Sequence, residues 1–427
     1  MRNSTIRLAF CLLAAMAWPA HARTPEQVAD DALRDAPVWD GHNDVPIQLR
    51  GRFGNMIDQF DFEDTTGTGG DKAEGTWRGR TMHTDLARLR KGKVGAQFWS
   101  IFVTPELPEP QAVQATLEQI DVTWRLIARY PRDLAPALTS GDVARAMRQR
   151  RIASLMGVEG GHSIGSSLGV LRQMYAMGVR YMTLTHSRST SWAGSATDAP
   201  GHDGLTDFGR QVVREMNRLG MMVDLSHVSE ATMIDALDET RAPVIFSHSG
   251  ARAVTPHARN VPDSVLARLP SNGGIVMAVA FPSYISEVHR QWGASRSGEE
   301  ARLKTLHPGD PVAVKEALEA WLKANHEPRA TVAQMADHID HIRKVAGIDH
   351  IGIGGDYDGM PSGPEGMEDV SGYPRLFAEL ARRGYSKGDL EKIASRNMMR
   401  VMRAAERHAA FRSGYKPIEA PLPSPGN

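Results

Sequence analysis

The sequence predicts an α/β protein in which eight parallel strands close into a (β/α)8 barrel, the TIM-barrel fold, with a helical insertion between strands 7 and 8. Two observations predict this class. Short β-rich runs alternate with helical patterns along the chain, the order expected of a parallel sheet with crossover helices. These runs number eight, which is the number of strands that closes such a barrel, and 427 residues suffice for one.

Each strand candidate is a short run rich in β-branched and other apolar residues, and most are bounded by Gly, Asp, Ser or Pro. In chain order the candidates are residues 38–44, 94–103, 152–161, 179–187, 221–229, 243–250, 273–281 and 350–359.

Helical segments separate several of these runs. The segments 111–130 and 206–220 are helix-like, and 332–347 has apolar residues at helical spacing and stops at a glycine. Residues 285–330 break the alternation, because they are charged and partly helical. We expect them to form a helical insertion at the mouth of the barrel; decoration of a side wall is the alternative.

Residues 1–22 have the pattern of a cleavable secretory signal: a basic start, a short apolar run and an Ala-His-Ala end. The apolar run is too short to span a bilayer. Cys11, the only cysteine, lies inside this segment, and a lipoprotein at Cys11 is the alternative that the bulky Phe10 disfavours. The expected mature chain, 23–427, is one domain without a thiol, exported most simply to a bacterial periplasm.

The balance of charge is neutral, with 50 basic and 50 acidic residues. This composition gives no support for nucleic acid or an anionic membrane surface as the main partner.

Side chains that can bind metal gather where six of the eight strand candidates end, the edge at which barrel enzymes place their chemistry. They are His42 and Asp44, Glu159, His186, His227, His248, and Asp356 with Asp358. Each alone has a plainer interpretation, as a turn cap, a solvated acid or a hydrogen-bonded histidine. Together they bring carboxylates close enough to need a cation. Imidazole and carboxylate without thiolate favour Zn²⁺, with Mn²⁺ or Fe²⁺ as alternatives.

Four further residues accompany this set. A serine precedes both His227 and His248, in "LSHVS" and "FSHSG". Asp224 is expected to orient neighbouring groups, with a buried hydrogen-bonded acid as the alternative. Asp40 follows the same alternation as His42 and Asp44, and the sequence leaves open whether it supports the site or only the barrel floor.

Several long motifs resemble those of the membrane (renal) dipeptidase family, the M19 metallopeptidases. They are "WDGHND", "GVEGGHSIGSSLGVLRQMYAMGVRYMTLTHS", "GRQVVREMNRLGMMVDLSHVS", "APVIFSHSGARAV", "RNVPD" and "IGIGGDYDG". The resemblance extends from about Asp35 to Val401. It implies a barrel of the amidohydrolase superfamily, two zinc ions, and hydrolysis of dipeptides, including those with a C-terminal D-residue.

The resemblance also implies roles for particular residues. The implied zinc ligands are His42 and Asp44 on one ion, His227 and His248 on the other, and Glu159 bridging both together with a water or hydroxide. The implied substrate contacts are His186 to the tetrahedral intermediate, Arg259 to the substrate carboxylate, and Asp356 as the acid that handles protons. A homodimer is likewise only implied, and the 285–330 insertion, longer than expected for animal members, leaves substrate range and dimer geometry open.

Three other functions remain open from the sequence. A hydrolase of the same fold and metals could cleave a lactone, an ester or a β-lactam. A periplasmic maturation or binding protein could keep the fold without peptidase activity, but such a protein would be expected to have lost a ligand. A protein that binds a sugar or another ligand without a metal is the third alternative, and it leaves the cluster of acids and histidines unexplained.

Overall fold

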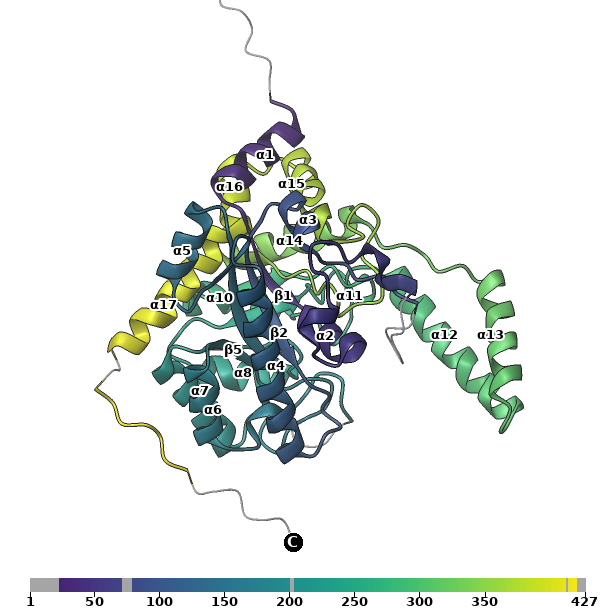
Figure 1. Ribbon diagram of the computed structural model, residues 1–427, viewed down its shortest axis with the longest axis horizontal. Coiled ribbons are helices and arrows are strands. Elements are labelled where there is room, and N and C mark those ends of the chain that lie inside the picture. The colour runs from purple at the N-terminus through teal and green to yellow at the C-terminus, as the bar shows by residue number, and fades with distance from the viewer. Residues whose placement is uncertain (1–22, 71–78, 200–202, 412–413, 421–427) are drawn as a thin grey trace, which may run out of the picture.

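A closed barrel of parallel strands surrounded by helices forms the body of the molecule (Figure 1). The computed structural model describes residues 23–70, 79–199, 203–411 and 414–420. The predicted signal, 1–22, lies outside the described residues. Within the described ranges, no helix is both long and apolar enough to cross a bilayer.

Eight strands make the barrel, as predicted. They are β1 (Val38–Asn43), β2 (Val94–Phe102), β4 (Ile152–Glu159), β5 (Val179–Thr183), β6 (Met222–Asp224), β7 (Ile245–Ser249), β8 (Ile275–Ala278) and β9 (Ile351–Ile353). Their order is β2-β1-β9-β8-β7-β6-β5-β4, and the parallel pairing of β2 with β4 closes the ring. Carboxyl ends of parallel strands meet at one rim, so the predicted convergence of strand ends is realised.

The predicted strand list needs two corrections. A ninth strand, β3 (Leu134–Pro136), pairs with the first residues of β4; three residues ending in proline are too few for a periodic pattern. Several strands also end earlier than predicted, which leaves His186, His227 and Asp356 in the loops that follow them. His227 and Asp356 have φ angles of 70° and 63°, which a strand cannot contain.

Seventeen α-helices are present in the described residues. They are α1 (Pro25–Asp35), α2 (Val45–Phe53), α3 (Leu86–Lys91), α4 (Glu109–Arg129), α5 (Ser140–Arg148), α6 (Leu168–Ala176), α7 (Asp207–Leu219), α8 (Glu230–Glu239), α9 (Asp263–Leu266), α10 (Leu269–Asn272), α11 (Pro282–Ile285), α12 (Glu287–Leu306), α13 (Pro311–Ala324), α14 (Val332–Ala346), α15 (Tyr373–Arg382), α16 (Lys387–Glu391) and α17 (Asn397–Phe411). Local sequence sets their ends: Thr331 and Gln334 form a capping box at α14, and Gly347 follows its last turn.

Large apolar side chains fill the barrel beneath the rim. Trp39 stacks on Phe98 with ring centroids 6.0 Å apart, and Tyr181 packs tilted against Phe98 at 4.8 Å. Met277 is buried in the same cluster. This floor leaves the rim as the face at which a ligand can approach the strand ends.

The segment predicted as an insertion is helical and lies between the seventh and eighth barrel strands, β8 and β9, as predicted. The short helix α11 lies at the rim and shares only Ile285 with this segment. The helices α12 and α13 then project from the barrel as an arm (Figure 1), in which only His289 and Leu303 are buried. The expected position of the segment at the mouth of the barrel stays a prediction.

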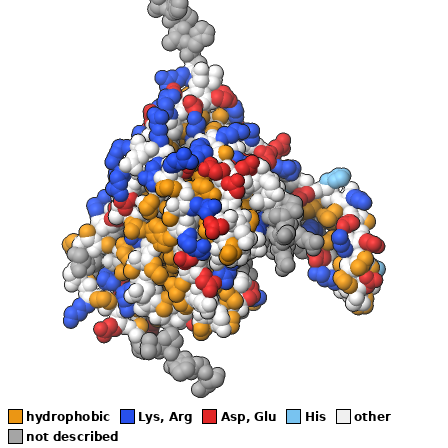
Figure 2. Space-filling view, in the orientation of Figure 1, with side chains coloured by type: hydrophobic (Ala, Val, Ile, Leu, Met, Phe, Trp, Pro, Cys, Tyr) orange, Lys and Arg blue, Asp and Glu red, His pale blue; other side chains and the backbone are white. Residues whose placement is uncertain are grey.

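The surface carries both signs of charge. On the face seen in Figure 2, basic and acidic side chains both spread over the body and the arm. This distribution agrees with the neutral net charge.

Candidate active site

Glu159, the last residue of β4, is the centre of the site. Its Oε1 lies 3.0 Å from His227 Nε2 and 3.4 Å from His248 Nε2. Its Oε2 lies 3.4 Å from His42 Nε2 and accepts a hydrogen bond of 3.0 Å from Ser100 Oγ. Glu159 is buried, so each carboxylate oxygen faces a different set of imidazoles away from bulk water.

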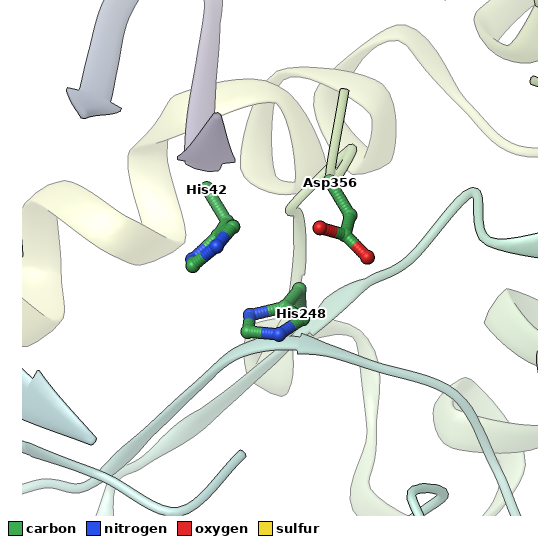
Figure 3. Close-up of side chains that lie close together, drawn as sticks. All are labelled: His42, His248 and Asp356. Atoms are coloured by element: carbon green, nitrogen blue, oxygen red, sulfur yellow. The ribbon is translucent and has the colours of Figure 1, made fainter. Parts of the chain in front are cut away.

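The predicted ligands form three groups of donor atoms, each group within 4.8 Å of one another. The groups are His42, Asp44 and Glu159; Glu159, His227 and His248; and His42, His248 and Asp356. In Figure 3 the side chains of the third group point toward a common space between the ends of their strands. Two of the groups share Glu159, and Nε2 of His42 is buried without a hydrogen-bond partner among the described residues. This donor set fits two divalent cations bridged by one carboxylate.

Contacts outside the cluster hold the imidazole of His42. Its Nδ1 lies 3.0 Å from the hydroxyl of Tyr181, and that hydroxyl donates to the carbonyl of Gly41 at 3.1 Å. The Tyr181 ring occupies the space over Gly157, where a Cβ would lie 2.0 Å from its Cζ. Glycine at 157 therefore makes room for the residue that orients His42.

The turn after β9 brings Asp356 to the cluster in a strained conformation. Asp356 and Asp358 both have positive φ, 63° and 66°. Asp40 secures this turn: its carboxylate accepts hydrogen bonds from Gly355 N at 2.8 Å and Tyr373 Oη at 2.5 Å. The question left open by the sequence is thus answered, since Asp40 supports the segment that carries Asp356.

Burial and neighbouring charges set the protonation of the cluster. Burial, and then repulsion from Asp44, raise the pKa of Asp356 well above its usual range. Burial acts to raise the pKa of Glu159 too, but attraction to His42 and the hydrogen bonds with His227 and His42 together outweigh it, and that pKa lies well below its usual range. Burial also lowers the pKa of His248 well below its usual range and that of His186 to about 4. These two imidazoles are therefore neutral near pH 7.

Arg259 is a buried cation at the edge of the cluster. It is 1% exposed and forms no ion pair within the described part of the chain. Its Nε and Nη1 have no hydrogen-bond partner there, while Nη2 donates to the carbonyl of His248 at 3.4 Å. Because a buried charge without a partner is unfavourable, this guanidinium is suited to an anionic group of a ligand.

A cavity of about 260 Å³ lies over the cluster. The residues predicted to bind metal or substrate line it, except His42 and Asp358. The sequence did not single out its apolar and aromatic walls, Ile47, Phe102, Phe281 and Tyr284. Phe102 ends β2 and Phe281 follows β8. Both could have been predicted from their positions at strand ends, but only polar residues at strand ends were considered.

Gly359 gives a test of this packing. A Cβ at this position would lie 2.2 Å from Asp44 Oδ2 and 2.6 Å from Asp356 Oδ1. We expect Gly359→Ala to displace these carboxylates and lower kcat/KM for a dipeptide by about 100-fold, with bound metal reduced. Gly298→Ala, in α12 where a Cβ meets nothing within 4 Å, is the matched control and should leave both unchanged. Equal activity in the two variants would contradict the packing described here.

Comparisons with known proteins show the family to which the chain is similar. The sequence model of the membrane dipeptidase family, peptidase family M19, matches residues 26–415. Dipeptidase 3 of Rattus norvegicus is 41% identical over 396 residues, which cover 92% of this chain and 70% of the relative. Dipeptidase 3 of Mus musculus is also 41% identical, over 92% of this chain and 69% of its own.

Solved structures give the same fold. The "probable dipeptidase PvdM" of Pseudomonas aeruginosa has a TM-score of 0.74 at 24% identity, over 90% of this chain and 99% of its own. A metallopeptidase from Rhodobacter sphaeroides, solved with a phosphinate mimic of L-Ala-D-Ala, has a TM-score of 0.69 at 24% identity. The match covers 87% of this chain and 99% of that structure. A dipeptidase of family M19 has a TM-score of 0.68 at 26% identity, over 87% of this chain and 98% of its own. The chain belongs to the membrane dipeptidase family, peptidase family M19, and is a metallo-dipeptidase by class.

Proposed function

We propose that the protein is an exported two-zinc dipeptidase that hydrolyses dipeptides, including those with a C-terminal D-residue. The observation that carries the proposal is the pair of three-residue donor groups that share Glu159 in a small cavity beside the unpaired Arg259. Export rests on the 1–22 segment, and the mass of the mature chain, expected to begin at Arg23, tests it.

The residues that would hold the two ions are His42, Asp44 and Glu159 for one, and Glu159, His227 and His248 for the other. Bound there, two zinc ions would polarise the scissile carbonyl. They would also lower the pKa of water, so that hydroxide is available as the nucleophile near neutral pH. The choice of zinc is supported by a donor set of imidazole and carboxylate, with no cysteine after Cys11.

Three residues would act on the substrate directly. Arg259 would bind the C-terminal carboxylate through two parallel hydrogen bonds. His186, neutral near pH 7, would donate a hydrogen bond to the carbonyl oxygen as negative charge develops on it. Asp356, whose pKa burial raises, would take a proton from the attacking water and deliver it to the leaving amine.

The size of the cavity and the position of Arg259 support a dipeptide substrate. A carboxylate bound beside the metal ligands leaves room for one residue on the C-terminal side of the scissile bond. Because Arg259 would bind the carboxylate and not a side chain of the C-terminal residue, a D-residue can bind as well as an L-residue. The L-Ala-D-Ala mimic bound by a structural neighbour supports this extension.

A substrate panel tests the proposal. Zinc-loaded protein is assayed with L-Ala-L-Ala, L-Ala-D-Ala, tri-alanine, a lactone and a β-lactam, beside a chelated sample. We expect both dipeptides to be cleaved faster than the tripeptide and the lactone, and the chelated sample to be inactive. Lactone hydrolysis with no dipeptide cleavage would contradict the proposal, and cleavage of the L-L dipeptide alone would remove its D-residue part.

A further inference from the structure

We propose that Ser247 and Asp224 are positioning residues that fix the tautomer of His248, so that its Nε2 presents a lone pair to the candidate metal position. The inference rests on the proposed function only in naming zinc as the ion that this lone pair would bind. The hydrogen-bond geometry that carries it does not depend on any metal.

Asp224 is a fully buried carboxylate surrounded by donors. Its Oδ1 accepts hydrogen bonds from the backbone N–H groups of Ser226 at 3.1 Å and Ser247 at 2.9 Å. Its Oδ2 accepts from Thr183 Oγ1 at 2.5 Å and Ser247 Oγ at 2.6 Å. All four partners donate, two of them as backbone N–H groups that can only donate, so the carboxylate acts as the acceptor throughout.

The direction of the next hydrogen bond follows. Since the Ser247 hydroxyl donates its proton to Asp224, its oxygen is left as an acceptor. His248 Nδ1 lies 2.8 Å from that oxygen, so Nδ1 must carry the ring proton. The neutral ring then has its lone pair on Nε2, which faces Glu159 Oε1 at 3.4 Å inside the candidate metal cluster.

The two Ser-His pairs of the sequence therefore differ in function. The hydroxyl of Ser226 does not contact the ring of His227; it accepts the backbone N–H of His248 at 3.1 Å. Nδ1 of His227 is buried without a hydrogen-bond partner among the described residues. His248 is thus held in one tautomer, whereas nothing described outside the cluster fixes the tautomer of His227.

Metal affinity gives the first test. Metal-free variants are titrated with Zn²⁺ against a competing chelator, after thermal unfolding shows that they are folded. Ser247→Ala should weaken one of the two zinc sites by about 10- to 100-fold, the usual effect of removing such a partner, and Ser247→Thr should restore it. Thr183→Val is the control: it removes a hydroxyl that donates to the Asp224 carboxylate but does not bond to an imidazole. It should change the zinc affinity by less than about 3-fold.

The tautomer itself can be observed in the wild-type protein. Long-range ¹H–¹⁵N spectra of the metal-free protein, with the His248 signals assigned from His248→Gln, should show protonation at Nδ1. Protonation at Nε2 would overturn the proposal, as would unchanged zinc affinity in folded Ser247→Ala or an equal loss in Thr183→Val. If His248 is protonated at Nδ1 and yet wild-type protein binds no zinc, the hydrogen-bond relay stands and the proposed function fails.

Discussion

Glu159→Gln is expected to lower kcat for a dipeptide by at least about 1,000-fold, equivalent to about 4 kcal/mol of transition-state stabilisation. The two oxygens of Glu159 face different imidazole groups, and the amide nitrogen of glutamine cannot bind a cation. We also expect bound zinc to fall from two ions per chain to one or none. Turnover and metal content, measured on the same folded sample, check both expectations.

Glu118→Gln is the control for this substitution. Glu118 lies on α4, where it pairs with Arg50 at 2.7 Å on the surface, and such a pair contributes about 1 kcal/mol or less. Its variant should keep full activity and two zinc ions. Near-native turnover in Glu159→Gln would show that the shared carboxylate is not at the centre of the chemistry.

Arg259→Ala is expected to raise KM for a dipeptide by about 100-fold while kcat changes much less. Truncating one partner of a buried charged pair costs about 2–5 kcal/mol, and a contact made equally in the ground and transition states is expressed in KM. The measurement is steady-state kinetics on L-Ala-L-Ala. Arg188→Ala, which removes a largely exposed arginine, should leave KM unchanged.

A modified substrate makes this test specific. A dipeptide amide lacks the carboxylate that Arg259 is proposed to bind, so the wild-type enzyme should cleave it about as poorly as Arg259→Ala cleaves the free dipeptide. In the variant, the free acid and the amide should then be nearly equal substrates. If the variant still prefers the free acid as strongly as the wild type does, another group binds the carboxylate.

The sequence predicted the barrel and the gathering of the ligands for one physical reason. Parallel strands bring their carboxyl ends to one rim, so residues distant in sequence, such as Glu159 and His248, could be expected to meet from local patterns alone. The three-residue strand β3 carries too little pattern to be seen. The ends of the strands were overestimated because polar residues such as His227 follow them without a break in the sequence.

The hydrogen bonds that position the site residues from distant parts of the chain could not be predicted in the same way. The hydrogen bonds of Asp40 to Gly355 and Tyr373 span 315 and 333 residues. The relay from Asp224 through Ser247 depends on the register of neighbouring strands, and Ser226, in the same motif, makes a different contact. Such contacts are set by how the barrel closes, and a single sequence carries no signal for them.

The central claim, that two ions sharing Glu159 carry dipeptide hydrolysis, is tested most directly by reconstitution. Metal-free wild-type protein is titrated with zinc while the rate of L-Ala-L-Ala hydrolysis is followed. We expect almost no activity before zinc is added and a plateau at two equivalents per chain. Full activity in the metal-free protein, or a plateau at one equivalent with no further rise, would contradict the claim.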